Sequence, residues 1–472
     1  MQPPAVPNRP SKHGEASAGT VVLIGASIRS AAQSAKRAGF RVLGIDHFGD
    51  VDTRQACQEF WILNEFQTKP ALIRRLQKFP HFVVGGLNTE PDATLLLRPA
   101  TETAKENPTK EADPFSARAL EKTDFGRWND PHWLEKLSKE CGLSFPSIFH
   151  TLPTNAEPPR SPGKRWLLKT ENSCGGLGVR WHTPSSPIAT ATSGLEPILA
   201  SSGNLNSKIE PSLKTTTQGE AHRTRHEIFQ EWVPGRPHGA TLICNGQDCS
   251  LLGVCRSLFT HLGDLPFVYR GSFGPVRLPK HLQQRLQMLG LRITRETGHR
   301  GLLNIDLVIN RSGEAFALEV NPRWSGSSEL IERWMQDRKQ IDSLFGAMFE
   351  ASNGLPVAGL NPQVHQPPDS VQSPWSSGPQ FLKRIIFARQ RFRFSQDLLT
   401  FPTKAWEDGC YQSTFSDLPA EGTWISPGEP ICTLISQIPE ATAAKSPGLG
   451  KEKGPMHQHR AFLRHFYEST QT

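Results

Sequence analysis

LLNIDLVINRSGEAFALEVNPR, at residues 302–323, contains two apolar runs separated by polar residues. The runs at 302–309 and 315–320 predict two paired antiparallel strands, with a turn at Asn310–Gly313 between them. Successive side chains of a strand point to opposite faces, so polar residues spaced two apart share one face.

Three polar side chains of this hairpin are candidate metal ligands. Asp306 and Glu319 are expected to lie near one another at its open end, and Asn321 follows two residues later on the same face. Oxygen ligands on one side of a sheet suit Mg²⁺, or Mn²⁺, that bridges nucleotide phosphates. Arg323 then places a fork-shaped cation beside those phosphates. The alternative is a strand that carries scattered, solvated carboxylates.

A second candidate site is a lysine followed by a glycine-rich loop. Lys169 lies near the end of an expected buried strand, RWLLKT at 165–170, and the loop TENSCGGLGV follows it. Gly175, Gly176 and Gly178 would let backbone N–H groups approach phosphate oxygens, while Lys169 supplies positive charge. The Walker pattern is absent because no GK[ST] follows. A glycine-rich loop by itself is also typical of an ordinary turn.

The N-terminal region predicts a parallel α/β unit. VVLIGA (21–26) and RVLGID (41–46) are expected strands on either side of a helix. Ser27 and Ser30 stand where the dinucleotide fingerprint G-x-G-x-x-G requires glycines. Together with the turn at Ser27, Arg29 at the helix start instead suits a substrate carboxylate or phosphate. The alternative is an ordinary turn between strand and helix.

Composition sets only wide limits on function. The chain has 472 residues, enough for roughly three domains, and 36% of them are hydrophobic. No stretch approaches ~18 continuous apolar residues, which argues against a membrane span. Eight cysteines without a CxxC pair, and an N-terminus without an apolar core, predict a reduced, cytoplasmic protein. Cys244, Cys249 and Cys255 are expected to be small buried thiols.

Charge and the last expected strands leave a nucleic-acid partner open. The net charge of +8 permits such a partner but equally suits an enzyme that handles phosphates and carboxylates. In FLKRIIFARQRFRF, Arg389, Arg391 and Arg393 alternate with other side chains, so one strand face is basic. A nucleic-acid reader could use that face. An edge strand with a solvated basic face over a phenylalanine core is the favoured interpretation.

The changes of pattern along the chain predict its organisation. The expected parts are a disordered tail at 1–19, an N-terminal α/β domain at 20–115, a central domain at 116–353 with a low-complexity insert at 184–222, a linker at 354–380, a small β domain at 381–437 and a tail at 438–472.

Taken in order along the chain, these motifs resemble the ATP-grasp superfamily. The series is Lys169, the GGLG loop, QEWVPG at 230–235, and Asp306 followed by Glu319-x-Asn321-x-Arg323. The run GASIRSAAQSAKRAGF and the segment GGLNTEP at 85–91 look like the ATP-grasp ligases of one-carbon-metabolising bacteria related to tyramine–glutamate ligase. The resemblance covers roughly 20–350 and, more loosely, the β region that follows. Its motifs are specific jointly, although each is weak alone.

The resemblance implies a fold and a reaction. The fold is the ATP-grasp fold, α/β with an N-terminal parallel βαβ pre-ATP-grasp domain and a small C-terminal β module. The reaction is ATP- and Mg²⁺-dependent joining of a small-molecule carboxylate to an amine through an acyl-phosphate, in biosynthesis of a one-carbon cofactor of the methanofuran or tetrahydromethanopterin kind. A homodimer is a further expectation, whereas membrane and nucleic acid are not expected partners.

Residue roles follow from the same resemblance. Lys169 would contact the α- and β-phosphates, with the 175–178 loop closing over them, and Arg323 would stabilise the transferring phosphoryl group. The adenine pocket would be lined by Gln230, Glu231 and the backbone at Val233. The metal ions would be held by Asp306, Glu319 and Asn321. Ser27, Arg29 and Arg323 are expected to recognise the acyl substrate.

The chain departs from the ATP-grasp pattern in two places that bear on ATP binding. Pro131 stands where many relatives have a second ATP-binding lysine, with Lys122 as the available substitute, and the expected acidic ribose contact falls near Pro237–His238. Two other function classes therefore stay open: a catalytically silent ATP-binding sensor and a basic nucleic-acid-binding module.

Overall fold

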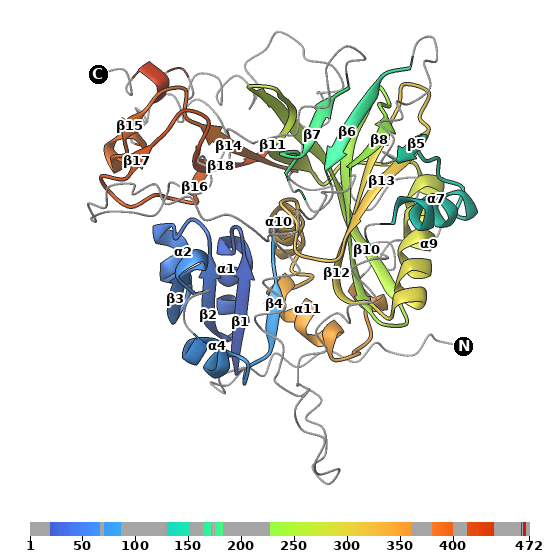
Figure 1. Cartoon of the computed structure of the whole chain (residues 1–472). Coiled ribbons are helices and arrows are strands. Elements are labelled where there is room, and N and C mark those ends of the chain that lie inside the picture. Colours follow the sequence, from blue (N-terminus) through green and yellow to red (C-terminus); the bar gives the residue numbers. More distant parts are fainter. Residues whose placement is uncertain are drawn as a thin grey trace, which may run out of the picture.

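The structure, a computed structural model, describes a little over half of the chain (Figure 1). The described residues are 19–66, 70–85, 128, 130–150, 164–170, 173, 175–182, 227–360, 380–399, 413–438, 464 and 466–468. The predicted insert 184–222 and Lys122 lie outside these ranges, as do most of the predicted linker and tails. No helix within the described ranges is long and apolar enough to cross a membrane.

The N-terminal domain is a parallel sheet, as the sequence predicts. In the described residues its strand order is β3-β2-β1-β4, and β1 pairs in parallel with both β2 and β4. The elements are β1 (Thr20–Gly25), α1 (Arg29–Arg37), β2 (Arg41–Asp46), α2 (Val51–Ala56), β3 (Glu59–Ile62), α3 (Leu63–Phe66), α4 (Pro70–Leu76) and β4 (His81–Val83). Because all strands run the same way, their carboxyl ends form one edge, which is where α/β sheets bind ligands.

A large antiparallel sheet forms the centre of the molecule. Its described strands follow the order β13-β12-β9-β10-β11-β14-β18-β16. They are β9 (Arg236–Asn245), β10 (Cys249–Leu262), β11 (Leu265–Gly274), β12 (Arg300–Ile309), β13 (Ala315–Asn321), β14 (Gln380–Phe387), β16 (Ser413–Ser416) and β18 (Pro430–Ile438). The β region that the sequence predicts as a small separate domain thus continues this sheet through β14, and only β15 (Phe392–Arg393) and β17 (Trp424–Ile425) pair apart from it.

Helices cover both faces of the large sheet. They are α9 (Lys280–Thr297), α10 (Ser328–Asp337) and α11 (Leu344–Ser352), with the short turns η2 (Ala358–Leu360) and η5 (Gln396–Leu399) beyond them. Leu242 of β9 lies against Gly290 of α9, whereas its neighbour Thr241 lies 3.3 Å from the hydroxyl of Ser327, just before α10. Adjacent strand residues face opposite ways, so α9 and α10 lie on opposite faces.

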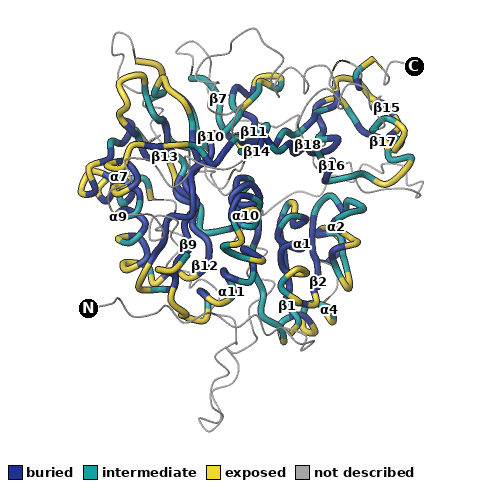
Figure 2. Tube along the Cα trace, turned by 180° about the vertical axis from the view of Figure 1, so that it is seen from behind, coloured by how far each residue is buried: buried dark blue, intermediate teal, exposed yellow. Residues whose placement is uncertain are grey.

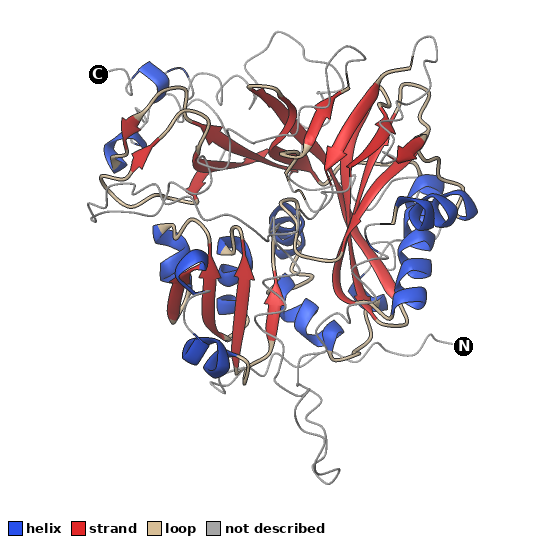
Figure 3. Cartoon of the chain, in the orientation of Figure 1, coloured by secondary structure: helices blue, strands red, loops and turns tan. Residues whose placement is uncertain are grey.

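A smaller antiparallel sheet stands over one end of the large one (Figure 3). Its described order is β5-β8-β6-β7, from β5 (Ile148–His150), β6 (Trp166–Thr170), β7 (Val179–Trp181) and β8 (Glu227–Glu231). Helix α7 (Pro131–Glu140) precedes it, and the Asp130 side chain caps this helix by accepting a hydrogen bond from the backbone N–H of His132 at 2.9 Å.

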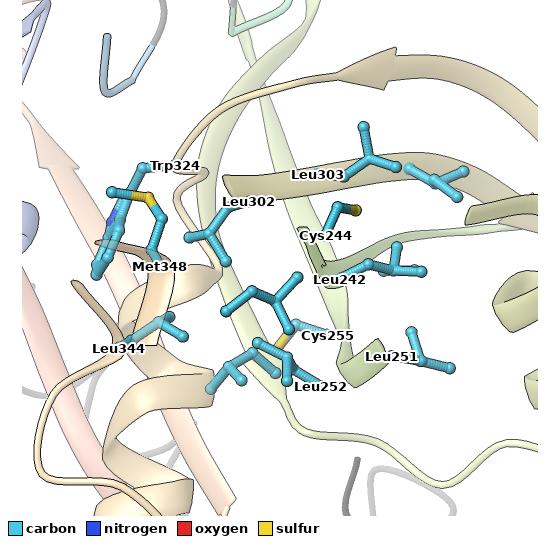
Figure 4. Packing of buried hydrophobic residues seen from close by; sticks show 14 of the residues in the cluster. Leu242, Cys244, Leu251, Leu252, Cys255, Leu302, Leu303, Trp324, Leu344 and Met348 are labelled. Carbon is cyan, nitrogen blue, oxygen red and sulfur yellow. The ribbon is translucent and has the colours of Figure 1, made fainter. Parts of the chain in front are cut away.

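Burial is concentrated between the large sheet and its helices (Figure 2). Leucines of β9, β10 and β12 pack with Leu344 and Met348 of α11 and with Trp324 (Figure 4). Cys244, Cys249 and Cys255 lie in this core as buried free thiols, as predicted. The core therefore joins the strands that carry Asp306 and Glu319 to the helices that follow them.

Arg29 of α1 connects the three parts of the chain. Its guanidinium donates to both carboxylate oxygens of Glu329 in α10, at 2.8 and 2.7 Å, and to Asp417 Oδ1 after β16, at 2.7 Å. The Arg29 side chain is 1% exposed, and Lys383 of β14 donates to the same Glu329 at 2.9 Å. Burial by itself would raise the pKa of Glu329, but Arg29 and Lys383 hold it well below its usual value.

A further set of hydrogen bonds fixes the C-terminal strands to the N-terminal domain. The Asp52 carboxylate accepts from the backbone N–H groups of Asp417, at 2.9 Å, and Leu418, at 3.0 Å. The N–H of Val51 donates to the carbonyl of Leu418 at 2.8 Å. Asp417 has a φ of 55°, which a non-glycine residue rarely adopts, so these contacts hold it in an unfavourable conformation.

Replacing Arg29 by methionine should lower the free energy of unfolding by about 3–5 kcal/mol, because Glu329 and Asp417 would each lose a buried cation. Urea unfolding near neutral pH measures this change. Arg75→Met is the matched control, since it removes an Arg–Glu pair whose two side chains are 47% and 45% exposed. The control should cost at most about 1 kcal/mol. Similar losses in the two variants would contradict the role given to Arg29.

Candidate nucleotide and metal site

The predicted hairpin is present as β12 and β13, and its polar side chains lie together. Asp306 pairs with Glu319 in the register of the two strands, and Asn304 pairs with Asn321. Asn321 Nδ2 donates to Asp306 Oδ2 at 2.9 Å and to Glu319 Oε1 at 3.2 Å. The geometric prediction is therefore confirmed, whereas the role of these residues as metal ligands stays a prediction.

The charges of this cluster are incompletely neutralised. Burial, and then the nearby Glu319, raise the pKa of Asp306 well above its usual value. Lys169 of β6 lies close to the cluster, with its Nζ 3.9 Å from Glu319 Oε2. Two carboxylates that face one another in this way favour a bound cation.

The donor set fits Mg²⁺ better than a metal with nitrogen or sulfur ligands. No group of three His, Cys, Asp or Glu side chains that could hold a metal occurs in the described ranges. The cluster would therefore offer Asp306, Glu319 and the amide oxygen of Asn321, with phosphate oxygens and water completing the shell. Asn321 now presents its amide nitrogen to the carboxylates, and turning that amide over would present the oxygen.

Asn304 belongs to the same cluster, although sequence reasoning missed it. This side chain is buried, and its Nδ2 donates to Asp306 Oδ1 at 2.9 Å. Within the described residues, its buried Oδ1 has no hydrogen-bond partner. Gly239 lies opposite Asp306 on β9, and a Cβ there would stand 3.2 Å from Asn304 Oδ1 and 3.3 Å from Asp306 Oδ1. Asn304 lies two residues before Asp306 and therefore on the same face of the strand, and this spacing is the sequence pattern that indicates its place in the cluster.

The small sheet brings Lys169 and Gln230 to one face. Leu167 of β6 pairs with Gln230 of β8, and Lys169 is two residues from Leu167, so both side chains point toward the large sheet. Gln230 is buried, and Val233 is half-buried just beyond β8. The structure therefore brings Lys169 and Gln230 to one side of this sheet, and their roles in binding ATP stay predictions.

Glu231 lies on the opposite face of the small sheet from Lys169. Its carboxylate accepts from Ser147 Oγ at 2.6 Å and from Lys164 Nζ at 2.8 Å. Partial burial opposes ionisation, yet these two donors lower its pKa. The structure therefore separates the Glu231 side chain from the face that carries Lys169, although the backbone at this position remains at the end of β8.

The glycine-rich loop is docked on the edge of β11. The carbonyl of Gly175 accepts a hydrogen bond from the N–H of Tyr269 at 2.8 Å. Gly176 has a φ of +81°, and a Cβ there would lie 1.8 Å from the carbonyl oxygen of Phe267. A residue with a side chain cannot make this close approach, so the loop requires glycine at 176.

The segment after β13 joins the site to the N-terminal domain. Burial lowers the pKa of Arg323 to about 10, still far above neutrality. Trp324 donates from its indole nitrogen to Ser30 Oγ at 3.0 Å, and its carbonyl accepts from the N–H of Gly85 at 3.1 Å. Ser27 is exposed near Gly85 at the carboxyl end of β1. The structure thus brings Arg323 to the edge of the N-terminal sheet where Ser27 lies.

Arg29 is a correction to the sequence prediction. A substrate-binding arginine needs donors that face a ligand, but the Arg29 guanidinium is buried and bound by Glu329, Asp417 and Gln33. The prediction that it binds the substrate carboxylate is therefore wrong. Its partners lie about 300 and 390 residues away in the chain, at separations that no local pattern reveals.

Asp46 and His238 have structural partners. Asp46 accepts from the N–H groups of Ile28, Phe48 and Gly49 at 3.0, 2.7 and 2.7 Å, and burial raises its pKa to about 6. It therefore organises the turn after β2, which agrees with the missing dinucleotide fingerprint. At the position expected to contact ribose, burial lowers the pKa of His238 to about 4, so its ring is neutral at pH 7.

Comparisons with known proteins agree with this architecture. Residues 195–327 match the sequence model of the ATP-grasp domain. A search of curated protein sequences finds no match. An L-amino acid ligase from Bacillus licheniformis superposes with a TM-score of 0.55 at 11% identity, covering 95% of this chain and 97% of the ligase.

Two further solved structures have a similar fold. Carboxyaminoimidazole ribonucleotide synthase from Aspergillus clavatus, complexed with ATP, has a TM-score of 0.55 at 13% identity, covering 96% of this chain and 98% of that one. N5-carboxyaminoimidazole ribonucleotide synthetase from Thermus thermophilus has a TM-score of 0.53 at 13% identity, covering 95% and 98%. The chain therefore has the ATP-grasp fold, a mixed α/β architecture with a parallel N-terminal sheet and antiparallel sheets around the site.

The docked loop gives a test with a control one residue away. Gly176→Ala should release the loop from β11, because the new Cβ would overlap the Phe267 carbonyl. Hydrogen exchange at the N–H of Tyr269, now bonded to Gly175, should become at least tenfold faster. Gly175→Ala carries a similar positive φ but meets nothing within 4 Å, so its effect should be smaller. Equal exchange in wild type and Gly176→Ala would refute the docking.

Proposed function

We propose that the protein is an ATP- and Mg²⁺-dependent ligase of the ATP-grasp type, which joins a carboxylate to an amine through an acyl-phosphate. The observation that carries this proposal is the cluster of Asp306, Glu319 and Asn321 on the large sheet, with Lys169 of the small sheet 3.9 Å from Glu319. Solved structures of similar fold include an L-amino acid ligase and an ATP-complexed synthase, which supports the same class of chemistry.

The residues of the site would act mainly through position and charge. When bound, Mg²⁺ would neutralise the phosphates, held by Asp306, Glu319 and Asn321. Lys169 would contact the α- and β-phosphates, and the loop containing Gly175, Gly176 and Gly178 would cover them. Gln230 and the backbone at Val233 would line the adenine pocket. Phosphoryl transfer needs little more than this, because alignment and charge neutralisation supply most of the catalysis.

The two chemical steps balance without a further reactant. A carboxylate oxygen of the substrate attacks the γ-phosphorus of ATP, and ADP leaves. The amine nitrogen then attacks the acyl carbon, inorganic phosphate leaves, and the amine loses a proton. The Arg323 guanidinium, charged at neutral pH, would stabilise the negative oxygens of the transferring group.

The acyl substrate would bind between Arg323 and the carboxyl ends of β1 and β4. Ser27 is exposed there, and the contacts of Trp324 with Ser30 and Gly85 bring the metal cluster to the same edge. A carboxylate in this place would lie beside the γ-phosphate. The resemblance to tyramine–glutamate ligase is the support for placing the reaction in biosynthesis of a one-carbon cofactor.

Release of phosphate that depends on Mg²⁺-ATP, measured with libraries of carboxylates and amines, tests the proposal. Glu319→Gln should reduce turnover at least a hundredfold while changing ATP affinity less than tenfold, because the lost charge faces the phosphates in the transition state. Asn321→Ala should reduce turnover less severely. Glu314→Gln is the matched control, since this exposed residue lies at the turn of the same hairpin.

The outcomes separate the proposed ligase from the two other classes. Unchanged turnover in both Glu319→Gln and Asn321→Ala would mean that the cluster has another role. ATP binding without turnover with any acceptor would assign the protein to nucleotide sensors. Salt-dependent RNA binding without nucleotide affinity would assign it to nucleic-acid binding.

A further inference from the structure

A cluster of arginines lies on the face of β14 opposite to Arg29 and α10. Lys383 and Arg384 are neighbours on this strand and therefore point to opposite faces. Lys383 is neutralised by Glu329 of α10. Arg384 lies on the face where Ile386 and Leu434 pack with Phe466 of the C-terminal segment. Arg270 of β11 and Arg389, just after β14, add further positive charge to this face.

Arg270 is directed to this cluster by an irregularity in β11. Strand β10 pairs Leu258 with Gly271 and Phe259 with Tyr269, so Arg270 is the extra residue of a β-bulge. A bulge changes the direction of a side chain and recurs beside functional sites. Gly271 stands opposite Arg384 on β14, which places Arg270 next to it across the strand pair.

Tyr467 lies at the centre of the cluster. Its hydroxyl donates to the carbonyl of Phe387 at 2.8 Å, and the guanidinium carbon of Arg389 lies 3.9 Å from the centroid of its ring. Although burial raises the pKa of Tyr467, Arg389, Arg270 and Arg384 are near enough to oppose that rise. Three guanidinium groups therefore act on the phenol of Tyr467, and that of Arg389 lies over its ring.

Two of the three arginines, Arg270 and Arg389, have no acidic partner among the described residues. Burial, and the neighbouring Arg389, lower the pKa of Arg270. The buried Nε of Arg270 has no hydrogen-bond partner, and neither Arg270 nor Arg389 forms an ion pair within the described part of the chain. Like charges repel, so such a group is unfavourable for the fold unless an anion joins it.

We propose that Arg270, Arg384 and Arg389, with Tyr467, form a binding site for the phosphoryl group of a small molecule, separate from the nucleotide site. Guanidinium forks match phosphate oxygens in geometry, and three cations suit a dianion better than a single carboxylate. The partly buried Arg270 favours a small group over the extended backbone of a nucleic acid. This proposal does not rest on the proposed ligase activity.

The site lies beside the phosphate loop of the nucleotide site. Tyr269, which binds Gly175, immediately precedes Arg270 in β11. The proposed anion site at the bulge and the glycine-rich loop would thus lie at neighbouring residues of β11. Binding of an anion at Arg270 would therefore act next to Tyr269, whose hydrogen bond to Gly175 anchors the loop.

Calorimetric titration of the full chain tests the site, with a non-hydrolysable ATP analogue and Mg²⁺ present to fill the nucleotide site. The probes are pyrophosphate, inorganic phosphate and glycerol 3-phosphate. Arg270→Gln and Arg389→Gln should each weaken pyrophosphate binding at least tenfold. Arg391→Gln is the matched control, because this arginine lies over the exposed Trp424 and outside the cluster, and it should change affinity less than twofold.

Thermal unfolding without added anion separates a ligand site from a structural contact. Relief of the repulsion should leave the Tm of Arg270→Gln unchanged or raise it by a few degrees. A clear fall in Tm would instead make Arg270 a structural residue and overturn the proposal. If that variant does not fold, the exposed Arg389→Gln decides the titration.

Three other results would also overturn the proposal. One is the absence of saturable pyrophosphate binding to the wild type. Another is an equal loss in Arg391→Gln, which would mean a diffuse surface charge. The last is salt-dependent binding of single-stranded RNA that Arg391→Gln weakens as much as Arg270→Gln, which would assign the charge to nucleic acid.

A tenfold preference for glycerol 3-phosphate over inorganic phosphate would support an organic phosphate as the ligand, and equal affinity would support recognition of the phosphoryl group alone.

Discussion

The buried guanidinium of Arg29 is the constraint on which the arrangement of the three parts depends. A charge that is 1% exposed is tolerated only where its partners are fixed, and here they come from α10 and from the segment after β16. Glu329 lies in the first turn of α10, six residues after Arg323. Whatever holds Arg29 against Glu329 therefore also positions the segment that carries Asn321 and Arg323. Through Arg29, the N-terminal domain thus contributes to the site by fixing the position of this segment.

Buried carboxylates are held in opposite ways in the hairpin cluster and in the hub, which consists of Arg29 with its partners Glu329 and Asp417 and of Lys383. Glu329 receives two cations within 2.9 Å, and its pKa falls well below the usual value. Asp306 receives two amides, and the Nζ of Lys169 lies 3.9 Å from the neighbouring Glu319. The first arrangement is complete as it stands and serves stability. The second would gain from a bound cation, because burial and Glu319 oppose the ionisation of Asp306, and this property suits the proposed metal-nucleotide site.

How far the sequence predicts this structure depends on how local each feature is. The register of Asp306 with Glu319 follows from two short strands and a tight turn, so period-two reasoning finds it. The same rule would have found Asn304, had its spacing from Asp306 been weighed. The prediction that Arg29 binds substrate is wrong because the partners of its guanidinium are separated from it by most of the chain. A helix start in isolation resembles an anion site, and only tertiary packing shows that carboxylates of the same chain already occupy the guanidinium.

Strand alternation explains how one sheet carries three charge clusters of different character. Lys383 and Arg384 are adjacent, yet one completes the hub and the other faces the arginines at the bulge. The hub pairs Glu329 with Arg29 and Lys383, the hairpin cluster holds two carboxylates near Lys169, and the bulge holds Arg270 next to Arg384. Folding alone favours balanced burial. Tyr269, whose N–H binds the loop at Gly175, and Arg270, at the bulge, are consecutive residues of β11, so the proposed anion site lies one residue from the anchor of that loop.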